Sequence, residues 1–449
     1  MTTLNDIYGN AVSTASQKAL DAFNDAMRLI RTYHGDPIAA LDRALEHDPT
    51  FALAWTTRAI VLAQLTDRMY ADEIAGSLRA ASIARMNDRE RSHFAGAVAW
   101  AEGRFHDGTT IFGRVSQDHP RDVLALQNGH VGCFFTGRQF DLRDWPIQSM
   151  RAHRFGDEGW HAILGMAAFG LEECGDYARA ETFGEEAIEA EPSDAWAAHA
   201  VAHVHEMRGD TEAGMGWLES TSDGWSTDCG FAYHNWWHLS LLHLDRQDHR
   251  AALKLYDERV RPNHDANIVL EMLDASALLW RLYLDGIDTG ERFAKLAKAW
   301  ERTIGDGVYA FNDLHAVMAF IGAGRMADAE RMLETLRRSA HGQGDNAEMT
   351  RAVGLPSAEA FVAFASGRYT EAVEKLAAIR GIAQRFGGSH AQRDVISLTL
   401  LQAAIRGGMK PTAEAFSAER LTMKPQSPWA QRLSRQARNI GAGQPAAAK

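Results

Sequence analysis

Two pairs of histidines have the spacing that lets both imidazoles of a pair act together. His199 and His203 are four residues apart, and so are His234 and His238. Residues four apart lie on one face of a helix, and Glu206 continues the face of the first pair. Two such imidazoles can chelate a divalent metal ion if a neighbouring element supplies a third ligand. They can also act as acid or base near neutral pH.

The pattern leaves three alternatives open for these pairs: a metal site, an acid–base site, or hydrogen-bonded side chains that stabilise the inner wall of the fold. HxxxH spacing without an HExxH motif is only a weak sign of zinc. The sequence therefore identifies no cofactor, and a divalent metal ion is one candidate. Cys229 lies shortly before the second pair, where a buried inert thiol is a more typical interpretation than a nucleophile.

Two further segments carry side chains of the same kinds, FNDLHAVMAF at 311–320 and GGSHAQRD at 387–394. The catalytic candidates are His199, His203, Glu206, His234, His238, Asp313 and His315. The substrate-binding candidates are Tyr233, Asn235, Trp237, Asp274, Asn312, His390 and Arg393. Glu206 or Asp313 would orient an imidazole, and Arg393 would hold an anionic part of the substrate. GGSHAQRD is expected to precede a helix, with backbone amides facing a ligand.

An internal repeat indicates which elements position these side chains. The pattern that begins at Gly175-Asp176 restarts at Gly209-Asp210, a period of 34 residues, which is that of a tetratricopeptide helix–turn–helix unit. Within it, Ala180 and Ala187 fall where the two helices need small residues, and Pro192 falls where the second helix ends. Looser copies follow along the chain, near Gly137, Gln247, Gly286, Gly324, Gly367 and Gly407.

The repeat predicts an all-α fold, a right-handed α-solenoid of tetratricopeptide-like helix–turn–helix repeats. We expect one array over residues 1–435, with the site-bearing repeats at about 160–400 and a flexible tail at 436–449. The first helices of such repeats line the concave side. His199 and His203 fall on the first helix expected at 195–208, and His234 and His238 on the next, so both pairs should face one hollow.

Composition excludes several classes of function. The formal charge of −12 gives no electrostatic support for binding nucleic acid or an anionic membrane. The N-terminus does not resemble a signal peptide, and no apolar run approaches the length of a membrane span. Cys133, Cys174 and Cys229 show no CxxC spacing, which is typical of a reducing compartment. We therefore expect a cytoplasmic protein, and a homodimer is an open option.

Several runs in this chain resemble one known family. They are AFGLEECGDYARAE, DAWAAHAVAHVHEMRG, FAYHNWWHLSLLHL, YAFNDLHAVMAF and GGSHAQRD. With them the chain resembles the tetratricopeptide-repeat protein 38 family, from about residue 36 to residue 431. The resemblance implies a tetratricopeptide-like helical array, in agreement with the period. It implies no reaction.

Three hypotheses about function follow. The first is a concave pocket lined by histidine, aspartate and tryptophan that binds a small polar molecule, with hydrolysis or another acid–base reaction as the activity. The alternative is a protein-interaction scaffold, the common role of tetratricopeptide arrays. In the third, the histidines only satisfy one another inside a closed superhelix.

Overall fold

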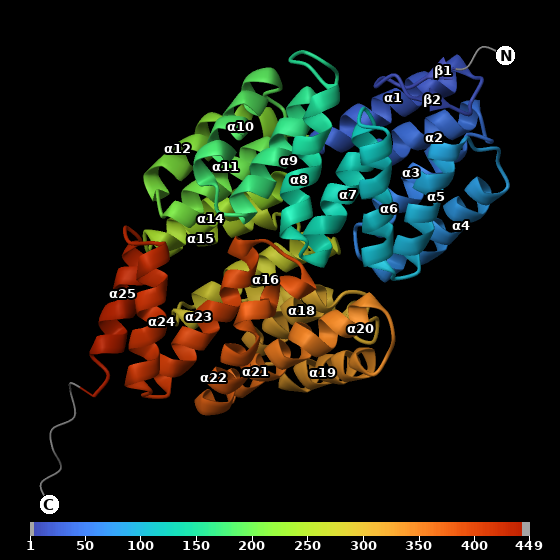
Figure 1. Cartoon of the computed structure of the whole chain (residues 1–449). Helices are drawn as coiled ribbons and strands as arrows, with labels where there is room; N and C mark the ends of the chain where they lie inside the picture. Colours follow the sequence, from blue (N-terminus) through green and yellow to red (C-terminus); the bar gives the residue numbers. More distant parts are fainter. Residues whose placement is uncertain (1–3, 442–449) are drawn as a thin grey trace, which may run out of the picture. The chain divides into compact units, whose positions relative to one another are not determined.

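The computed structural model of the protein describes residues 4–441, and almost every element in it is a helix (Figure 1). Two short strands, β1 (Leu4–Asn5) and β2 (Ala11–Val12), pair antiparallel with Leu4 opposite Val12. The remaining elements are α-helices joined by short turns, with brief 3-10 or π-helical segments after some of them. This confirms the predicted all-α helical-repeat fold.

The helices group into two compact units. Unit 1 runs up to Val204 and includes Trp217–Asn235, and unit 2 comprises His205–Gly216 and the chain from Trp236 onward. Unit 1 contains α1 (Gln17–Thr32), α2 (Pro37–His47), α3 (Ala52–Ala63), η1 (Arg68–Tyr70), α4 (Ala71–Ser82), α5 (Asp88–Ala101), α6 (Phe105–Asp118), α7 (Val123–Thr136), α8 (Gln139–Ser149), η2 (Met150–Ala152), α9 (Trp160–Glu173), α10 (Tyr177–Ala190) and α13 (Ser222–Trp225).

Three helices contribute residues to both units, namely α11 (Ala195–Arg208), α12 (Thr211–Ser220) and α14 (Ala232–Asp245). Unit 2 contains α15 (His249–Leu255), η3 (Tyr256–Val260), α16 (Val269–Leu284), α17 (Arg292–Trp300), η4 (Glu301–Thr303), α18 (Ala310–Gly322), α19 (Met326–Ala340), α20 (Asp345–Met349), η5 (Thr350–Gly354), α21 (Leu355–Ala365), α22 (Tyr369–Ile379), η6 (Arg380–Phe386), α23 (His390–Arg406), α24 (Lys410–Met423) and α25 (Pro428–Arg438). Whether the repeats of residues 1–435 form one continuous array, as the sequence predicts, is not tested by this division into units.

The repeat of unit 1 has the structure that its sequence predicts. Gly175 has a φ of +80° at the end of α9, a conformation that favours glycine, and the side chain of Asp176 caps the start of α10. Ala180 and Ala187 are fully buried, and α10 ends two residues before Pro192. The next helix, α11, has the predicted bounds.

Helices α8 and α9 approach so closely that their contact requires a glycine. A Cβ on Gly170 would overlap the carbonyl oxygen of Leu142 and lie 2.5 Å from the Cα of Arg143. Pro146 lies inside α8 and has no N–H, so the Leu142 carbonyl lacks its usual helical partner four residues on. The contact at Gly170 fixes α8 against α9.

A strap joins two distant segments of unit 1. The backbone N–H of Gly35 donates to the carbonyl of Asp228 at 2.8 Å, and that of Gly230 donates to the carbonyl of Tyr33 at 2.7 Å. The ring of Tyr33 packs against Trp196 and Phe231, with ring centroids 6.0 and 5.0 Å apart. The strap therefore holds the end of α1 at the aromatic cluster beside α11.

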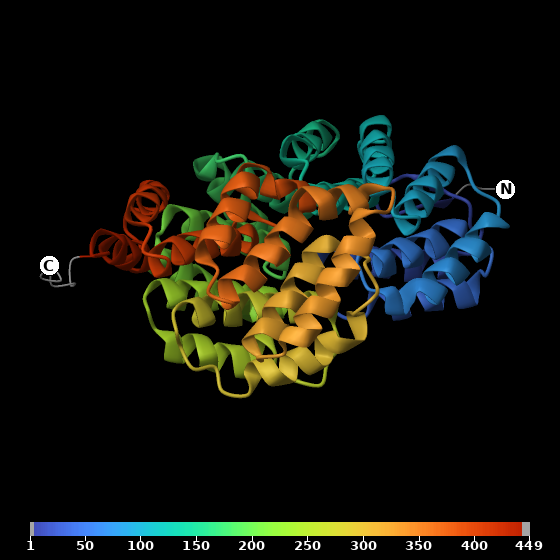
Figure 2. The ribbon, with the colours of Figure 1, turned by 90° about the horizontal axis from the view of Figure 1, so that it is seen from below.

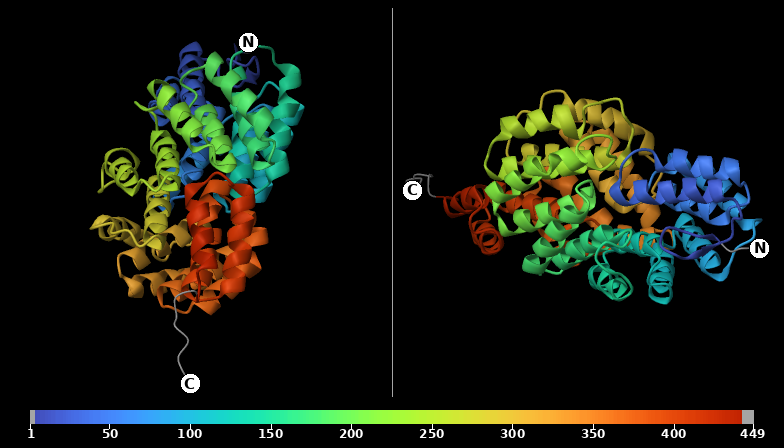
Figure 3. Two further views of the ribbon diagram at one scale, coloured as in Figure 1. Left: turned by 90° about the vertical axis from the view of Figure 1, so that its left-hand side faces the viewer. Right: turned by 90° about the horizontal axis from the view of Figure 1, so that it is seen from above.

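Unit 2 has an aromatic core of its own. Trp280 on α16 stacks on Phe361 of α21 at 4.9 Å between centroids and donates its indole N–H to Thr399 of α23. Helix α18 packs against both α16 and α21 (Figure 2), and α24 and α25 form the last helix pair (Figure 3).

The end of the described chain differs from the prediction of a tail that begins at residue 436. Helix α25 continues to Arg438, because Leu433 and Ala437 are buried and hold its last turns. The predicted tail residues 442–449 lie outside the described residues. Among the described helices, none combines the length and the apolar composition needed to cross a bilayer.

Candidate functional site

Three of the predicted histidines meet inside unit 1. His199 and His203 project from α11, and His234 projects from the first turn of α14. The Nε2 atoms of His199 and His234 are 3.1 Å apart, and the rings of His199 and His203 lie edge to face at 4.4 Å between centroids. One ring nitrogen from each histidine lies within 4.8 Å of the others. We call these residues the histidine triad.

The histidine triad is deeply buried, with exposed fractions of 1% for His199, 0% for His203 and 7% for His234. The burial follows from aromatic neighbours. Phe169 of α9 lies 5.2 Å from the His199 ring, and Phe231 lies 4.8 Å from the His234 ring. These rings cover much of the surface of the imidazoles and separate them from open solvent.

A carboxylate that the sequence analysis missed stands behind the triad. Oε2 of Glu172, in the last turn of α9, lies 3.5 Å from Nδ1 of His203, and both side chains are fully buried. A carboxylate at Nδ1 stabilises an N–H there and leaves Nε2 as the basic nitrogen. An acidic residue at the end of the apolar run AILGMAAFGLEE was the available sign, since that run is otherwise typical of a buried helix.

Glu206 and His238 form a second pair, within unit 2. The His238 Nδ1 lies 3.0 Å from one carboxylate oxygen of Glu206, and the Lys424 ammonium lies 3.5 Å from the other. Trp237 is fully buried, and the guanidinium of Arg281 lies over its ring at 5.4 Å. Glu206 therefore contacts an imidazole and an ammonium group, and its predicted role in orienting a catalytic imidazole stays a prediction.

The predicted residues on α18 lie in the core of unit 2. The His315 Nδ1 donates to the carbonyl of Phe311 at 2.7 Å, and burial lowers the His315 pKa to about 4. Burial, with a further contribution from Asp306, raises the pKa of Asp313 to about 8. Asn312 and, on α16, Asp274 are also buried. At neutral pH the His315 imidazole is therefore uncharged, and the Asp313 carboxyl is largely protonated.

The remaining candidates have structural contacts. Asn235 donates to the carbonyl of Ala195 at 3.2 Å and so ties α14 to the start of α11. Tyr233 packs edge-on against His234. Arg393 donates to the carbonyl of Gly388. His390 is half-buried and lines a cavity of unit 2. Their roles in binding stay predictions.

The segment GGSHAQRD was expected to precede a helix. In the structure, its second half forms the first turns of α23, which begins at His390. Ser389 is the N-cap of α23, and its hydroxyl accepts from the backbone of Gln392. The Gln392 side chain in turn accepts from the Ser389 backbone, which completes a capping box. These amides are therefore used by the helix itself rather than offered to a ligand.

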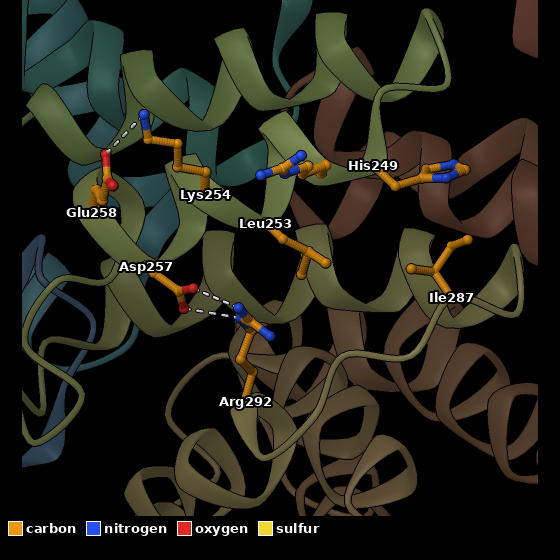
Figure 4. Close-up of a pocket in the computed structure, with 8 residues that line it drawn as sticks. His249, Leu253, Lys254, Asp257, Glu258, Ile287 and Arg292 are labelled. Atoms are coloured by element: carbon orange, nitrogen blue, oxygen red, sulfur yellow. Dashed lines mark hydrogen bonds and ion pairs between the residues drawn. The ribbon is translucent and has the colours of Figure 1, made fainter.

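A depression at the surface of unit 2 contains none of the predicted residues (Figure 4). It is lined by side chains of α15, η3 and α17, among them His249 and Leu253, and by Ile287 from the loop before α17. Most of its charged groups are paired with each other, since Arg292 pairs with Asp257 and Lys254 with Glu258. A shallow site whose charges are already paired offers a ligand little specific attraction.

The chain was compared with known proteins. No protein-family model matches it. Solved structures with partial similarity include the Cut9–Hcn1 hetero-tetramer of APC/C (TM-score 0.41, 11% identity, 93% of this chain and 76% of that one). Human IFIT1, solved as a dimer with m7Gppp-AAAA, gives 0.39 and 14%, covering 96% and 92% of the two chains. Yeast Tom70 gives 0.34 and 12%, covering 94% and 96%. Scores below 0.5 support no inference about the function of this chain.

The tetratricopeptide-like repeat therefore rests on the chain's own period and helix pairs. Its finer resemblance to the tetratricopeptide-repeat protein 38 family stays a prediction.

Proposed function

We propose that this protein is an interaction scaffold, a tetratricopeptide-like helical array that binds a segment of a partner protein on the outer face of α8. The observation that carries the proposal is a group of large apolar side chains in contact with solvent. Phe140 is 69% exposed, Ile147 is 37% exposed and Phe155 is 85% exposed. We call these three residues the α8 patch.

The geometry of the α8 patch suits a protein ligand. Phe140 and Ile147 are seven residues apart on one helical face, and Phe155 follows shortly after the helix. The opposite face of α8 packs into unit 1 through Leu142 and Trp145, and Gly170 fixes the helix from behind. A rigid helix with apolar side chains on both faces is unusual at a surface that stays in water.

The charges around the α8 patch indicate the chemistry of the partner. The guanidinium of Arg143 lies 5.4 Å from the centre of the Phe140 ring and pairs with Asp144 at 2.7 Å, and Arg151 and Arg154 are exposed further along the same segment. Arginines around an apolar patch attract acidic groups, although the chain as a whole carries −12. The partner segment that fits is an amphipathic helix with apolar anchors flanked by Asp or Glu.

The burial of the predicted groove residues supports the scaffold over a histidine-lined substrate pocket. Twelve of the fourteen candidate side chains are less than a tenth exposed: His199, His203, Glu206, His234, Asn235, Trp237, His238, Asp274, Asn312, Asp313, His315 and Arg393. Groups so placed do not reach a ligand that stays in the open hollow of an array. The exposed apolar surface is what remains available for recognition.

The test uses a double variant of the patch, Phe140→Asp with Ile147→Asp. Two fluorescent helical peptides serve as probes, with the same leucine face and either Glu or Lys at the flanking positions. Fluorescence anisotropy is expected to show that the Glu peptide binds the native chain and that the double variant weakens binding at least about tenfold, because both apolar anchors are lost. The Lys peptide should bind more weakly than the Glu peptide, by charge.

The matched control is Ile83→Asp, which changes an exposed apolar residue of unit 1 away from α8. This variant should bind the Glu peptide like the native chain. Equal binding by the native chain and the double variant, or preference for the Lys peptide, would remove the α8 patch as the recognition surface.

One cavity favours a second candidate function, the binding of a small amphipathic molecule. It lies within unit 2, between the end of α11 and helices α23 and α24, and has a volume of about 160 Å³. Its apolar wall includes Leu401 and Phe416, and its polar wall includes His390 and Lys424. Mixed linings of this kind orient ligands that have one polar end.

Native mass spectrometry of the purified chain tests this second candidate. Ser397→Trp places a bulky ring at the exposed edge of the cavity, and Thr422→Trp places one on the exposed surface of α24 outside the lining. A bound small molecule should accompany the native chain and Thr422→Trp, and should fall about tenfold in Ser397→Trp. Absence of a bound molecule from the native chain, or equal retention by both variants, would contradict it.

A further inference from the structure

We propose that the histidine triad binds one divalent transition-metal ion, with zinc as the natural occupant. The ligand atoms are one imidazole nitrogen from each of His199, His203 and His234. This inference concerns the interior of unit 1 and does not depend on the scaffold function of the α8 patch. It rests on three observations: the convergence of the imidazoles, the carboxylate behind them and the wall around them.

The convergence brings the imidazoles to nearly the separation that a metal requires. Ligand nitrogens at about 2.0–2.1 Å from a tetrahedral zinc ion are roughly 3.3 Å from one another. The His199 and His234 nitrogens are already 3.1 Å apart, and all three ligand nitrogens lie within 4.8 Å. The remaining difference from the zinc separation is at most about 1.5 Å, and binding of the ion would have to close it. The i, i+4 pair on α11 supplies two ligands and α14 supplies the third.

The carboxylate behind the triad fixes the ligand atom of one imidazole. Glu172 lies 3.5 Å from Nδ1 of His203. This arrangement directs the lone pair of His203 through Nε2 and raises its basicity, as carboxylates do for many zinc-bound histidines. The negative charge of Glu172 also offsets part of the charge of a divalent ion in a buried place.

The wall around the triad selects the kind of metal. Phe169, Trp196 and Phe231 surround the imidazoles and contribute no oxygen ligand from their rings. Magnesium and calcium prefer oxygen ligands and keep water, whereas imidazole nitrogen suits zinc, copper, nickel and cobalt. The chemistry of the donors therefore favours a borderline transition metal.

A hydrogen bond between two imidazoles is the competing explanation for the 3.1 Å contact. One neutral histidine can donate to another at this distance. It explains the pair of His199 and His234, but it leaves the approach of His203 with its carboxylate as a separate coincidence. A metal ion accounts for all four side chains with one cause, and the two explanations differ in metal content.

The first measurement is metal analysis of the full chain, purified without a histidine tag. The expected result is about one zinc equivalent per chain, and X-ray absorption of that zinc should show a first shell dominated by imidazole nitrogen. After removal of zinc by a chelator, Co²⁺ should restore one equivalent and give the intense visible bands of a tetrahedral site. These measurements use the native chain, so they remain informative even if a variant fails to fold.

Variants then assign the ligands. His203→Gln and His234→Gln should each reduce the bound metal at least about tenfold, because an amide is a poor zinc ligand. The matched control is His130→Gln, since His130 is also buried in unit 1 and packs against Phe169 and Trp196 but lies outside the triad. This control should keep the metal.

Three results would overturn the proposal. One is a native chain that contains less than about a tenth of an equivalent of metal and takes up no Co²⁺ after chelation. Another is a first shell of oxygen ligands in the X-ray absorption spectrum. The third is equal loss of metal from His130→Gln and from the triad variants, which would show a general effect on unit 1.

Discussion

Asp313→Asn is expected to make the protein more stable, and the gain should increase as the pH rises. Asp313 is buried on α18, and its Oδ2 has no hydrogen-bond partner among the residues that the structure describes. Burial raises its pKa from an ordinary 3.8 to about 8. An ionised carboxylate in this place is costly, and an amide of the same shape removes the ionisation.

The pH range follows from the direction of the shift. Between about pH 4 and pH 8 the folded chain holds a proton on Asp313 that the unfolded chain releases, so the free energy of unfolding falls as the pH rises. The amide introduced by Asp313→Asn does not titrate, and the difference between the two chains should reach on the order of 5 kcal/mol near pH 8. Urea unfolding at several pH values measures it.

The control for this prediction is Asp265→Asn, which changes an exposed aspartate of unit 2 and should leave the pH profile unchanged. An Asp313→Asn chain that is less stable than the native one at every pH would mean that Asp313 is ionised and satisfied in the folded state. That result would also revive the catalytic role predicted for Asp313.

Arg89→Met should destabilise unit 1 by roughly 3–5 kcal/mol, because it removes the guanidinium that neutralises a buried carboxylate. Arg89 on α5 donates to Asp122 at 2.6 Å and to the carbonyl of Ala11 at 3.1 Å. Asp122 also accepts from His93 at 2.8 Å. Although burial opposes it, His93 and Arg89 hold the pKa of Asp122 well below its usual range.

Thermal and urea unfolding of three variants measure this effect. Arg58→Met removes a guanidinium whose partners Asp42 and Glu73 are about half exposed, so a loss below about 1 kcal/mol is expected. Adding Asp122→Asn to Arg89→Met should recover part of the stability, since it removes the unpaired charge. Similar losses from Arg58→Met and Arg89→Met would show that the burial of the Arg89 pair contributes nothing special.

The fold could be predicted in detail where local signals agree. Helix α11 has the expected bounds because Pro192 and Gly209 mark its two sides and the alanines between fit a close contact. For His199 and His234 the repeat predicted only that both lie on first helices that face one hollow. Their separation of 35 residues differs from the period of 34, so the close approach of their rings did not follow from the period alone.

The burial of the candidate residues could not be predicted, because it depends on side chains from other repeats. His199 faces inward as expected, but Phe169 of α9 and Phe231 before α14 cover it. Aromatic residues in a single sequence give no sign of which hollow they fill. His315 is fully buried too, but the aromatic ring that packs against it is Phe311, one turn earlier on its own helix.

One error in the interpretation could have been avoided. Ser389 and Gln392 have the S-x-x-Q spacing of a capping box, and that spacing places the start of α23 at His390, as the structure does. The sequence analysis expected the segment to precede the helix with backbone amides facing a ligand. Serine is instead among the residues preferred as helix N-caps.

The strap between Tyr33–Gly35 and Asp228–Gly230 also sets an order of events during synthesis on the ribosome. The first helix of the chain emerges early, yet its final backbone partners are almost two hundred residues later. Until those partners leave the exit tunnel, the phenol ring of Tyr33 has neither Trp196 nor Phe231 to cover it. The nascent N-terminal half must therefore wait with apolar surface uncovered, which makes it a substrate for chaperones that act during translation.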